Sequence, residues 1–333
     1  RIVYQLSSDL KDEFDSVHVA STGGLWESEL AAKGIQHHKI LDIDSKNPLT
    51  VLKLLTSIRQ IIKKNEITIV HTHHRMAAFY IRLLKLVHPK LIHVYTAHNV
   101  FKDKLPLYGF ALKNAKSVAV GEAVNKNLKE DVGITDSRVI YNGVVLKETD
   151  DQVDEIISYG GIKLGCIARL SEQKGLTYLL DAMSLVNQHD LTLFLVGDGE
   201  LRPDCEKLAV ELNLQNRIRF LGNRTDIPRL LKTADIAVQS SHWEGFGLSA
   251  VEAMASGKPI IASDVAGLGD VVRGYGLLFE KENAHHLAQQ ILSLENPELC
   301  QKVIEKVKRR ASDFHISKMV EHYIKIYRNL DNE

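Results

Sequence analysis

The chain has 333 residues, of which 44% are hydrophobic and 25% are charged, and this length favours two domains over one. Its 42 basic and 42 acidic residues leave a formal net charge of zero, which gives no argument for nucleic acid as a partner. Three isolated cysteines, without even-numbered or metal-binding spacing, indicate neither a disulfide framework nor a zinc site. No apolar run approaches the ~20 residues of a membrane span, so we expect a soluble or at most peripheral protein.

The first ten residues place Ile2, Val3, Leu6 and Leu10 on one face of a helix. A doubly wound domain normally opens with a central strand and a Gly-rich turn before its first helix. We therefore expect that such a strand and turn precede Arg1 in the natural protein.

Beyond this helix, strands and helices alternate in the order that a parallel sheet requires. In the first half we predict strands over residues 16–20, 35–40, 67–71, 91–96, 117–120 and 137–140. Predicted helices lie between them, over residues 25–33, 48–64, 76–87, 105–112 and 123–130. An acidic stretch with little apolar content, residues 142–155, is predicted to be a linker.

A second alternation of strands and helices follows this linker. Its predicted strands cover residues 162–167, 191–196, 218–220, 236–239, 259–262 and 276–279. Its predicted helices cover residues 176–187, 200–212, 227–233, 248–256, 284–294, 298–309 and 316–329.

These patterns predict an α/β protein with two Rossmann-like, doubly wound parallel-sheet domains that face a cleft. The first domain is predicted over residues 1–150 and the second over residues 151–312. Residues 313–333 are predicted to form a helix that packs back toward the first domain. Ligands of such folds bind at the C-terminal ends of the strands, so the loops after the strands are the candidate site.

The most informative stretch is a turn and a short helix after the fourth strand of the second half. Two glycines in the turn let the backbone approach a ligand, and the start of the helix offers N–H groups suited to phosphate. Two carboxylates are placed by this one loop, one before the turn and one inside the helix. These residues are Glu244, Gly245, Phe246, Gly247, Leu248 and Glu252. A core helix with solvated carboxylates is the alternative interpretation.

Two cations follow the first strand of the second half. Arg169 and Lys174 flank one loop, and Gly175 admits the helix that follows. Cations at a strand-to-helix turn can hold a diphosphate and stabilise it as it leaves, whereas solvated surface charges are the alternative. A second tight loop, residues 197–199, is predicted at the same edge of the sheet.

Histidines follow two strands of the first half. His71, His73 and His74 come at the end of the third strand, where neither a carboxylate nor a cysteine accompanies them, so a metal site is disfavoured. His98 closes the next strand before a basic loop, where an imidazole can donate a hydrogen bond to a substrate hydroxyl. A histidine that bonds only to the backbone is the alternative interpretation.

Taken together, these motifs resemble the retaining glycosyltransferases of family 4, which have GT-B architecture. The motifs that carry the resemblance are Arg169 with Lys174 and Gly175, residues 196–199, residues 220–222 and the run from Glu244 to Pro259. The resemblance implies a nucleotide-sugar donor, with a UDP-sugar favoured, in the second domain. It implies a glycan or lipid-linked acceptor in the first domain. It further implies a cytoplasmic enzyme of polysaccharide or glycolipid biosynthesis that needs neither a metal nor a cofactor.

The resemblance also assigns roles to single residues. Glu244 and His98 would be catalytic, with Glu244 beside the donor sugar and His98 against the transferred sugar. Glu252 would bind the ribose hydroxyls, and Arg169 and Lys174 would clamp the diphosphate. The other assignments are the backbone at Gly245, Phe246, Gly247 and Leu248 for the diphosphate, Asn223 or Arg224 for the base, and His73, Lys102 and Lys104 for the acceptor side.

Two other classes of protein stay open at this point. An epimerase that acts on a nucleotide sugar would use the same loops, and a non-catalytic nucleotide-sugar-binding subunit would keep the diphosphate clamp. The chain also departs from the family pattern beyond the donor loop, where Asp270 stands in place of a common glutamate.

One charge pattern bears on the acceptor. From residue 53 to residue 104 the chain has ten basic residues and only two acidic ones. A basic first domain can rest on an anionic membrane surface, here the inner face of the plasma membrane, and meet a lipid-linked acceptor there. Ordinary solvated helix faces explain the same pattern.

Overall fold

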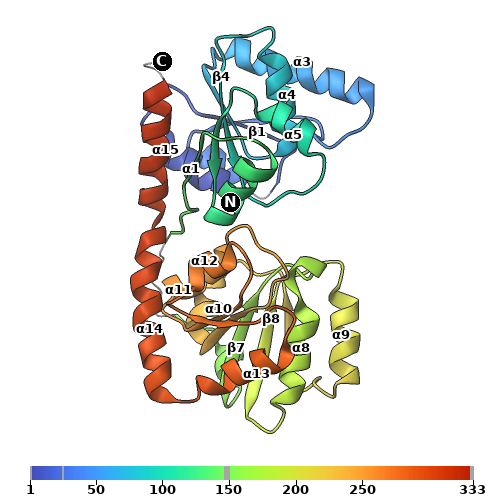
Figure 1. Cartoon of the computed structure of the whole chain (residues 1–333), viewed down its shortest axis with the longest axis vertical. Coiled ribbons are helices and arrows are strands. Elements are labelled where there is room, and N and C mark those ends of the chain that lie inside the picture. Colours follow the sequence, from blue (N-terminus) through green and yellow to red (C-terminus); the bar gives the residue numbers. More distant parts are fainter. Residues whose placement is uncertain (1, 25, 146–150, 331–333) are drawn as a thin grey trace. The chain divides into compact units, whose positions relative to one another are not determined.

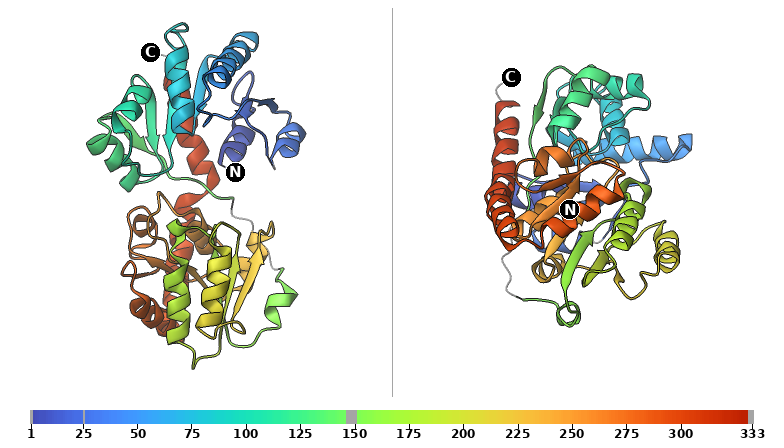
Figure 2. Two further views of the ribbon diagram at one scale, coloured as in Figure 1. Left: turned by 90° about the vertical axis from the view of Figure 1, so that its right-hand side faces the viewer. Right: turned by 60° about the horizontal axis from the view of Figure 1, so that its bottom comes forward.

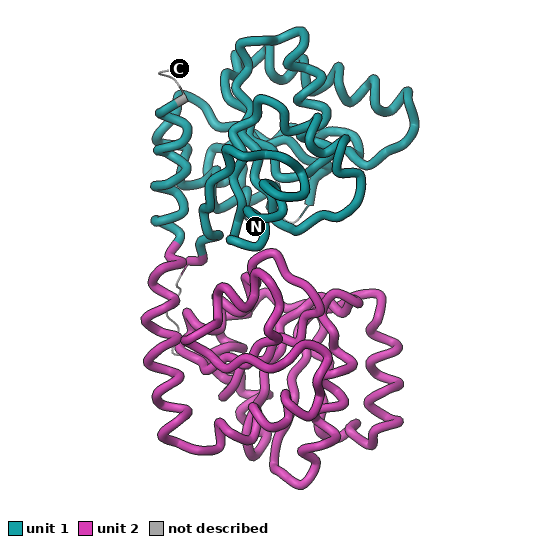
Figure 3. The backbone as a smooth tube through the Cα atoms, in the orientation of Figure 1, with its two compact units in different colours: residues 1–143, 316–333 teal, residues 144–315 magenta. Residues whose placement is uncertain are grey.

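The computed structural model describes residues 2–24, 26–145 and 151–330 (Figure 1). The chain divides into two compact units (Figure 3): unit 1 combines the residues up to Gly143 with those from Ile316 onward, and unit 2 is Val144–His315. The predicted linker, residues 142–155, lies partly outside the described residues. Its described part contains a helical turn that the sequence pattern does not predict, α7 (Asp154–Ile157).

Unit 1 contains two parallel sheets within its described residues, where one sheet was expected. All six strands overlap their predicted ranges, but the first two pair only with each other. The smaller sheet is β1 (His18–Ser21) and β2 (Gln36–Lys39), and the larger sheet is β3 (Ile69–Thr72), β4 (Ile92–Ala97), β5 (Lys116–Ala119) and β6 (Ser137–Val139), in this order.

The helices of unit 1 follow the prediction except at one place. The expected helix over residues 123–130 is divided, because the chain widens into a π-helical turn at Asn127–Asp131. Single π turns often occur at functional sites, and this one begins at a buried asparagine. The α-helices are α1 (Ile2–Leu10), α2 (Glu27–Ala32), α3 (Pro48–Lys64), α4 (Arg75–Leu84), α5 (Leu105–Leu112), α6 (Glu122–Lys126) and α15 (Ile316–Leu330).

Unit 2 is a six-stranded parallel sheet with helices on both faces (Figure 1; Figure 2). The strand order is β12 (Leu277–Phe279), β11 (Ile260–Ser263), β10 (Ile236–Gln239), β7 (Ile162–Ile167), β8 (Leu191–Val196) and β9 (Ile218–Gly222). All six residues of β8 are buried, and five of them are apolar, as expected for a strand that has a neighbour on both sides in a parallel sheet.

The helices of unit 2 alternate with these strands. One layer is α8 (Leu176–Leu185), α9 (Arg202–Glu211) and α13 (Ala284–Ser293), and the other contains α10 (Ile227–Thr233), α11 (Leu248–Ala255), α12 (Leu268–Val272) and α14 (Pro297–Ala311). The short helix α12 was not predicted, and it contains Asp270, the residue that departs from the family pattern. The prediction of an α/β fold built on parallel sheets is confirmed.

Candidate functional site

The sheet of unit 2 places two loops side by side at the point where its winding reverses. β7 and β10 are neighbours, and the chain leaves β7 toward β8 on one side but leaves β10 toward β11 on the other. In open α/β sheets, ligands bind outside the C-terminal ends of the strands at such a switch point. The loop after β7 carries Arg169 and Lys174, and the loop after β10 carries Glu244.

Hydrogen bonds join these two loops. The Ser240 hydroxyl donates to the carbonyl oxygen of Lys174 over 2.9 Å, and the His242 amide donates to the carbonyl oxygen of Gln173 over 2.8 Å. Gly175 has a positive φ of 54°, and a Cβ atom there would lie only 2.4 Å from the carbonyl oxygen of Ser240. The close approach of the loops therefore requires glycine at this position.

Lys174 and Glu244 form an ion pair across the two loops. Their side chains are only 16% and 14% exposed, so the pair is held in a largely enclosed place. Sequence reasoning assigned both residues to the donor side, and the structure brings them into direct contact. When an anionic ligand binds, the ammonium group of a lysine in such a pair can leave its carboxylate partner and pair with a phosphate oxygen.

The second predicted cation is more exposed. Arg169 is 74% exposed and pairs with Glu200, with 3.2 Å between Nη2 and Oε2. Both cations of the predicted diphosphate clamp thus have a carboxylate partner in the structure. Binding of a diphosphate would replace these carboxylates at one or both cations.

The Gly-Phe-Gly turn leads into α11 as the sequence pattern predicts. Gly247 precedes the helix with a φ of 90°, and a Cβ atom there would lie 2.7 Å from a side-chain carbon of Leu268. Phe246 is buried and meets Phe314 edge to face at 5.4 Å between ring centroids, so only its backbone is available to a ligand. Gly245 lies in the same turn, and Leu248 is the first residue of α11. This geometry suits anion binding at the start of the helix.

The residues predicted for the ribose and the base lie at the same edge of the sheet. Glu252 is half-buried in the second turn of α11. Asn223 is exposed directly after β9. Arg224 forms two hydrogen bonds with Asp226, at 2.9 and 2.7 Å, and these bonds hold the pKa of the Asp226 carboxyl below its usual range. Of the two candidates for the base, Asn223 is therefore the more accessible.

In unit 1, two predicted histidines meet at the ends of neighbouring strands. His73 follows β3 and His98 follows β4, with 3.0 Å between Nδ1 of His73 and Nε2 of His98. Burial lowers the pKa of His98 to about 4 and lowers the pKa of His73 well below its usual range. Both imidazoles are therefore neutral near pH 7, and each can donate one hydrogen bond and accept another.

The loop after His98 is held by residues that sequence reasoning missed. Asn127 bonds the backbone of Phe101 twice, accepting from its amide at 3.0 Å and donating to its carbonyl at 2.9 Å. Arg75 lies over the Phe101 ring at 3.8 Å from the centroid and pairs with Asp103 at 2.9 Å. Nothing in the sequence distinguishes Asn127, because its contact depends on the π turn. These anchors fix the loop that carries two exposed cations, Lys102 and Lys104.

The described residues contain no group of three or more histidine, cysteine, aspartate or glutamate side chains placed to hold a metal ion. His71 instead lies 2.6 Å from the Tyr327 hydroxyl through Nδ1 and 2.7 Å from the Thr96 hydroxyl through Nε2.

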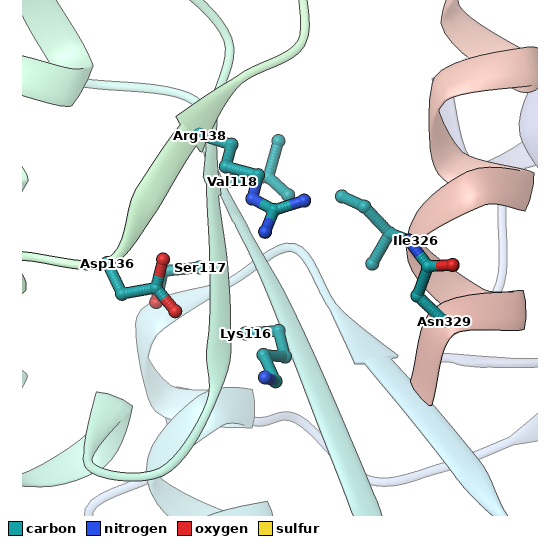
Figure 4. A pocket seen from close by; sticks show the side chains of 7 residues that line it. All are labelled: Lys116, Ser117, Val118, Asp136, Arg138, Ile326 and Asn329. Carbon is teal, nitrogen blue, oxygen red and sulfur yellow. The ribbon is translucent and has the colours of Figure 1, made fainter. Parts of the chain in front are cut away.

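A separate pocket of about 310 Å³ lies in unit 1 (Figure 4). It lies where β5 and β6 begin, at the opposite edge of the sheet from His73 and His98. Its lining residues include none of the predicted site residues; they are Lys116, Ser117, Val118, Asp136, Arg138, Ile326 and Asn329.

Comparison with known proteins decides the family. Residues 1–148 match the model of Glycosyltransferase Family 4, and residues 148–310 match that of Glycosyl transferases group 1. An uncharacterized glycosyltransferase of Methanocaldococcus jannaschii is 30% identical to the chain over 82% of this chain and 79% of its own length. The chain belongs to the family 4 glycosyltransferases.

The resemblance to family 4 that was inferred from the motifs of this glycosyltransferase is therefore confirmed, as is its GT-B architecture, while retention of configuration stays a prediction. A solved glycosyltransferase from Rickettsia africae superposes with a TM-score of 0.86 and 26% identity, over 99% of this chain and 94% of that one. A UDP-Gal:α-D-GlcNAc-diphosphoundecaprenol α-1,3-galactosyltransferase of Escherichia coli is 28% identical over 67% of this glycosyltransferase and 64% of its own length.

Proposed function

We propose that this glycosyltransferase moves a sugar, with retention of configuration, from a UDP-sugar to a glycan or lipid-linked acceptor in polysaccharide or glycolipid biosynthesis. The observation that carries the proposal is the enclosed Lys174–Glu244 pair between the two loops at the switch point of unit 2. A UDP-sugar is favoured because the similar galactosyltransferase from Escherichia coli uses UDP-Gal, and its lipid-diphosphate acceptor supports a lipid-linked one.

The proposed reaction depends mainly on charged side chains that lie beside the leaving diphosphate. The bond between the sugar C1 and the diphosphate oxygen breaks, and the acceptor oxygen forms a new bond to C1 on the same face. The acceptor hydroxyl gives its proton to the departing phosphate oxygen, and the nucleoside diphosphate leaves. Lys174 and Arg169 stabilise the charge that builds on the diphosphate, and the enclosed Lys174 acts more strongly than the exposed Arg169 because water is largely excluded around it.

The remaining residues orient the substrates. The half-buried Glu252 on α11 would accept hydrogen bonds from the ribose hydroxyls, and Glu244 would face the donor sugar. His98, neutral near pH 7, would bond a hydroxyl of the transferred sugar. We propose that these groups suffice without a metal or a cofactor.

The test is binding and turnover of a panel of UDP-, GDP- and ADP-sugars by the full-length protein, measured by calorimetry and by release of free nucleotide. We expect one UDP-sugar to bind, and we expect Glu252→Ala to weaken its binding about 10- to 100-fold because the ribose loses a charged hydrogen-bond partner. The exposed Glu305 on α14 offers a control, and Glu305→Ala should bind as wild type does.

Three outcomes would contradict the proposal. Conversion of the bound sugar without an acceptor would instead make the protein an epimerase. Binding without release of nucleotide, with any acceptor offered, would make it a binding subunit. If no nucleotide sugar binds, the chain has kept only the fold of the family and not its activity.

We also propose that unit 1 rests on an anionic membrane surface at the edge where His98 lies. No helix in the described residues is long and apolar enough to cross a bilayer. Leu49 and Leu52, at the start of α3, are 70% and 62% exposed, next to the exposed Lys53. An apolar side chain beside cations is the pattern of an interfacial contact.

Contacts within unit 1 connect this start of α3 to the loop after His98. Asp44 lies 3.8 Å from His74, and the next residue, Arg75, pairs with Asp103 in that loop. The loop that leads into Leu49 and Leu52 therefore reaches the edge of the sheet at which Lys102 and Lys104 lie.

Replacing Leu49 and Leu52 with serine should lower binding to vesicles of phosphatidylglycerol and phosphatidylcholine about tenfold, because two apolar anchors are lost. Leu86 and Val87, at the other end of α4, are 65% and 59% exposed and provide a matched control pair. Sedimentation of both double variants with vesicles measures the effect. Equal losses in both pairs, or no loss in either, would remove this surface from consideration.

A further inference from the structure

His73 and His98 form a stacked pair at the ends of β3 and β4. Their ring centroids are 5.3 Å apart and their planes are inclined by 28°, while Nδ1 of His73 and Nε2 of His98 share a hydrogen bond of 3.0 Å. No other hydrogen bond of the His98 side chain occurs within the described part of the chain. Among the described residues, Nδ1 is therefore the ring nitrogen of His98 that is left to meet a ligand.

A third imidazole, that of His71, packs against His73 of this pair. The ring of His71 lies 4.1 Å from that of His73, and both of its nitrogens are bonded, to Tyr327 and to Thr96. Thr96 is fully buried and lies 2.7 Å from the hydroxyl of Tyr323. The two tyrosines come from α15, so the ring of His71 is fixed between a strand and a helix. It forms a rigid surface against which His73 is held.

The number of protons that the two histidines carry determines which tautomers they can adopt. Burial keeps both imidazoles neutral, so each carries one N–H, and a single proton occupies the contact between them. If His73 donates, His98 keeps its own proton on Nδ1; if His98 donates, its Nδ1 is an acceptor. In either case His73 decides whether His98 donates a hydrogen bond to a substrate hydroxyl or accepts one from it. The group bonded to the other ring nitrogen of a histidine commonly has this effect.

We propose that His73 is a positioning residue that holds the imidazole of His98 in one orientation and one tautomer. The proposal rests on the proposed function, because it takes His98 to be the group that contacts the transferred sugar. In this role His73 contacts His98 and not the acceptor, although the motif resemblance had placed His73 on the acceptor side.

Three substitutions of His73 separate positioning from a structural role. In His73→Asn the amide places polar atoms where Nδ1 lies, in His73→Gln it places them where Nε2 lies, and in His73→Leu the hydrogen bond is lost. The first readout is the tautomer of His98, from the ring ¹⁵N chemical shifts of protein labelled in its 15 histidines, with the His98 signals assigned by their absence in His98→Gln. We expect one tautomer in wild type and His73→Asn, and a mixture in the other two.

The second readout is steady-state sugar transfer. Leucine and glutamine at position 73 should lower kcat about 10- to 100-fold, with a smaller change in the KM of the donor, because a misplaced contact costs most at the transition state. Asparagine should restore kcat to within about threefold of wild type. His93, a buried histidine of β4 that bonds Thr72 at 2.8 Å, provides the control, and His93→Asn should leave the His98 tautomer unchanged.

The outcomes are distinguishable. A single, unchanged tautomer of His98 in the leucine and glutamine variants would overturn the positioning role, as would equal activity of the asparagine and glutamine variants. If wild type transfers no sugar, the proposed function fails, while the tautomer measurement still decides whether His73 orients His98.

Discussion

Lys174→Ala is expected to lower the rate of sugar transfer about 100- to 1,000-fold, the usual cost of removing one group that stabilises charge in a transition state. Lys174 is the enclosed cation of the predicted clamp, 16% exposed and paired with Glu244. Its loss removes positive charge from the place where the diphosphate would leave. The measurement is kcat and KM of the UDP-sugar found by the donor panel.

The substitution also leaves the Glu244 carboxylate enclosed without its partner, which destabilises the fold by itself. Two further variants separate these effects. Lys163 is similarly enclosed, 17% exposed and 3.8 Å from Asp235, but it lies at the start of β7, at the opposite edge of the sheet. Lys163→Ala should therefore lose stability without losing transfer.

The double variant Lys174→Ala with Glu244→Gln should recover stability because no unpaired charge remains, yet it should stay as slow as Lys174→Ala alone. If Lys163→Ala slows transfer as much as Lys174→Ala does, the loss comes from a weakened fold and the clamp assignment is wrong.

Unit 1 is expected to lose stability steeply as the pH falls from 7 to 5. Burial lowers the pKa of His71 and His93 to about 3, that of His98 to about 4, and that of His73 well below its usual range. A histidine in the unfolded chain has a pKa of about 6.5. Below this pH the unfolded chain binds protons that the folded unit does not bind. These histidines therefore cost no stability above pH 6.5, and the free energy of unfolding of unit 1 falls as the pH is lowered below it.

For His71, His93 and His98 the expected loss is about 1.4 kcal/mol per pH unit each, or about 2 kcal/mol each at pH 5, and His73 adds a loss in the same direction. Together these losses would remove much of the ~5–15 kcal/mol that usually holds a domain folded. Urea unfolding at both pH values measures the effect.

The two tryptophans report on the two units separately, because Trp26 lies in unit 1 and Trp243 in unit 2. Fluorescence of Trp243→Phe follows unit 1, and that of Trp26→Phe follows unit 2. The expectation is contradicted if the two units lose the same stability on acidification. His93→Gln removes one of the four groups and should make the pH dependence of unit 1 shallower.

Local patterns sufficed for most elements of this fold. The apolar run of β8 and the Gly-Phe-Gly turn before α11 depend on neighbours in the sequence, so their positions follow from it. The same holds for Lys174 and Glu244, because each lies in the loop that follows a strand and parallel strands end at one edge of a sheet.

Other features depend on contacts between distant residues and escape sequence reasoning. The separation of β1 and β2 from the larger sheet is a matter of strand pairing, which no periodicity reports. The contact of His71 with Tyr327 joins residues 256 positions apart. The π turn at Asn127 was also missed, because its residues read as an ordinary helix. The Arg224–Asp226 pair is local, by contrast, and the two-residue spacing of opposite charges was a usable signal.

The membership of α15 in unit 1 has a consequence for synthesis of the protein. Unit 2 is one continuous stretch of chain, whereas unit 1 needs both the residues up to Gly143 and those from Ile316 onward. The buried Tyr323 and Tyr327 that complete its interior leave the ribosome only after the whole of unit 2 has done so. Domains generally fold in the order in which they emerge, but here the second unit can finish first, and the N-terminal half waits until the residues from Ile316 onward have been synthesised.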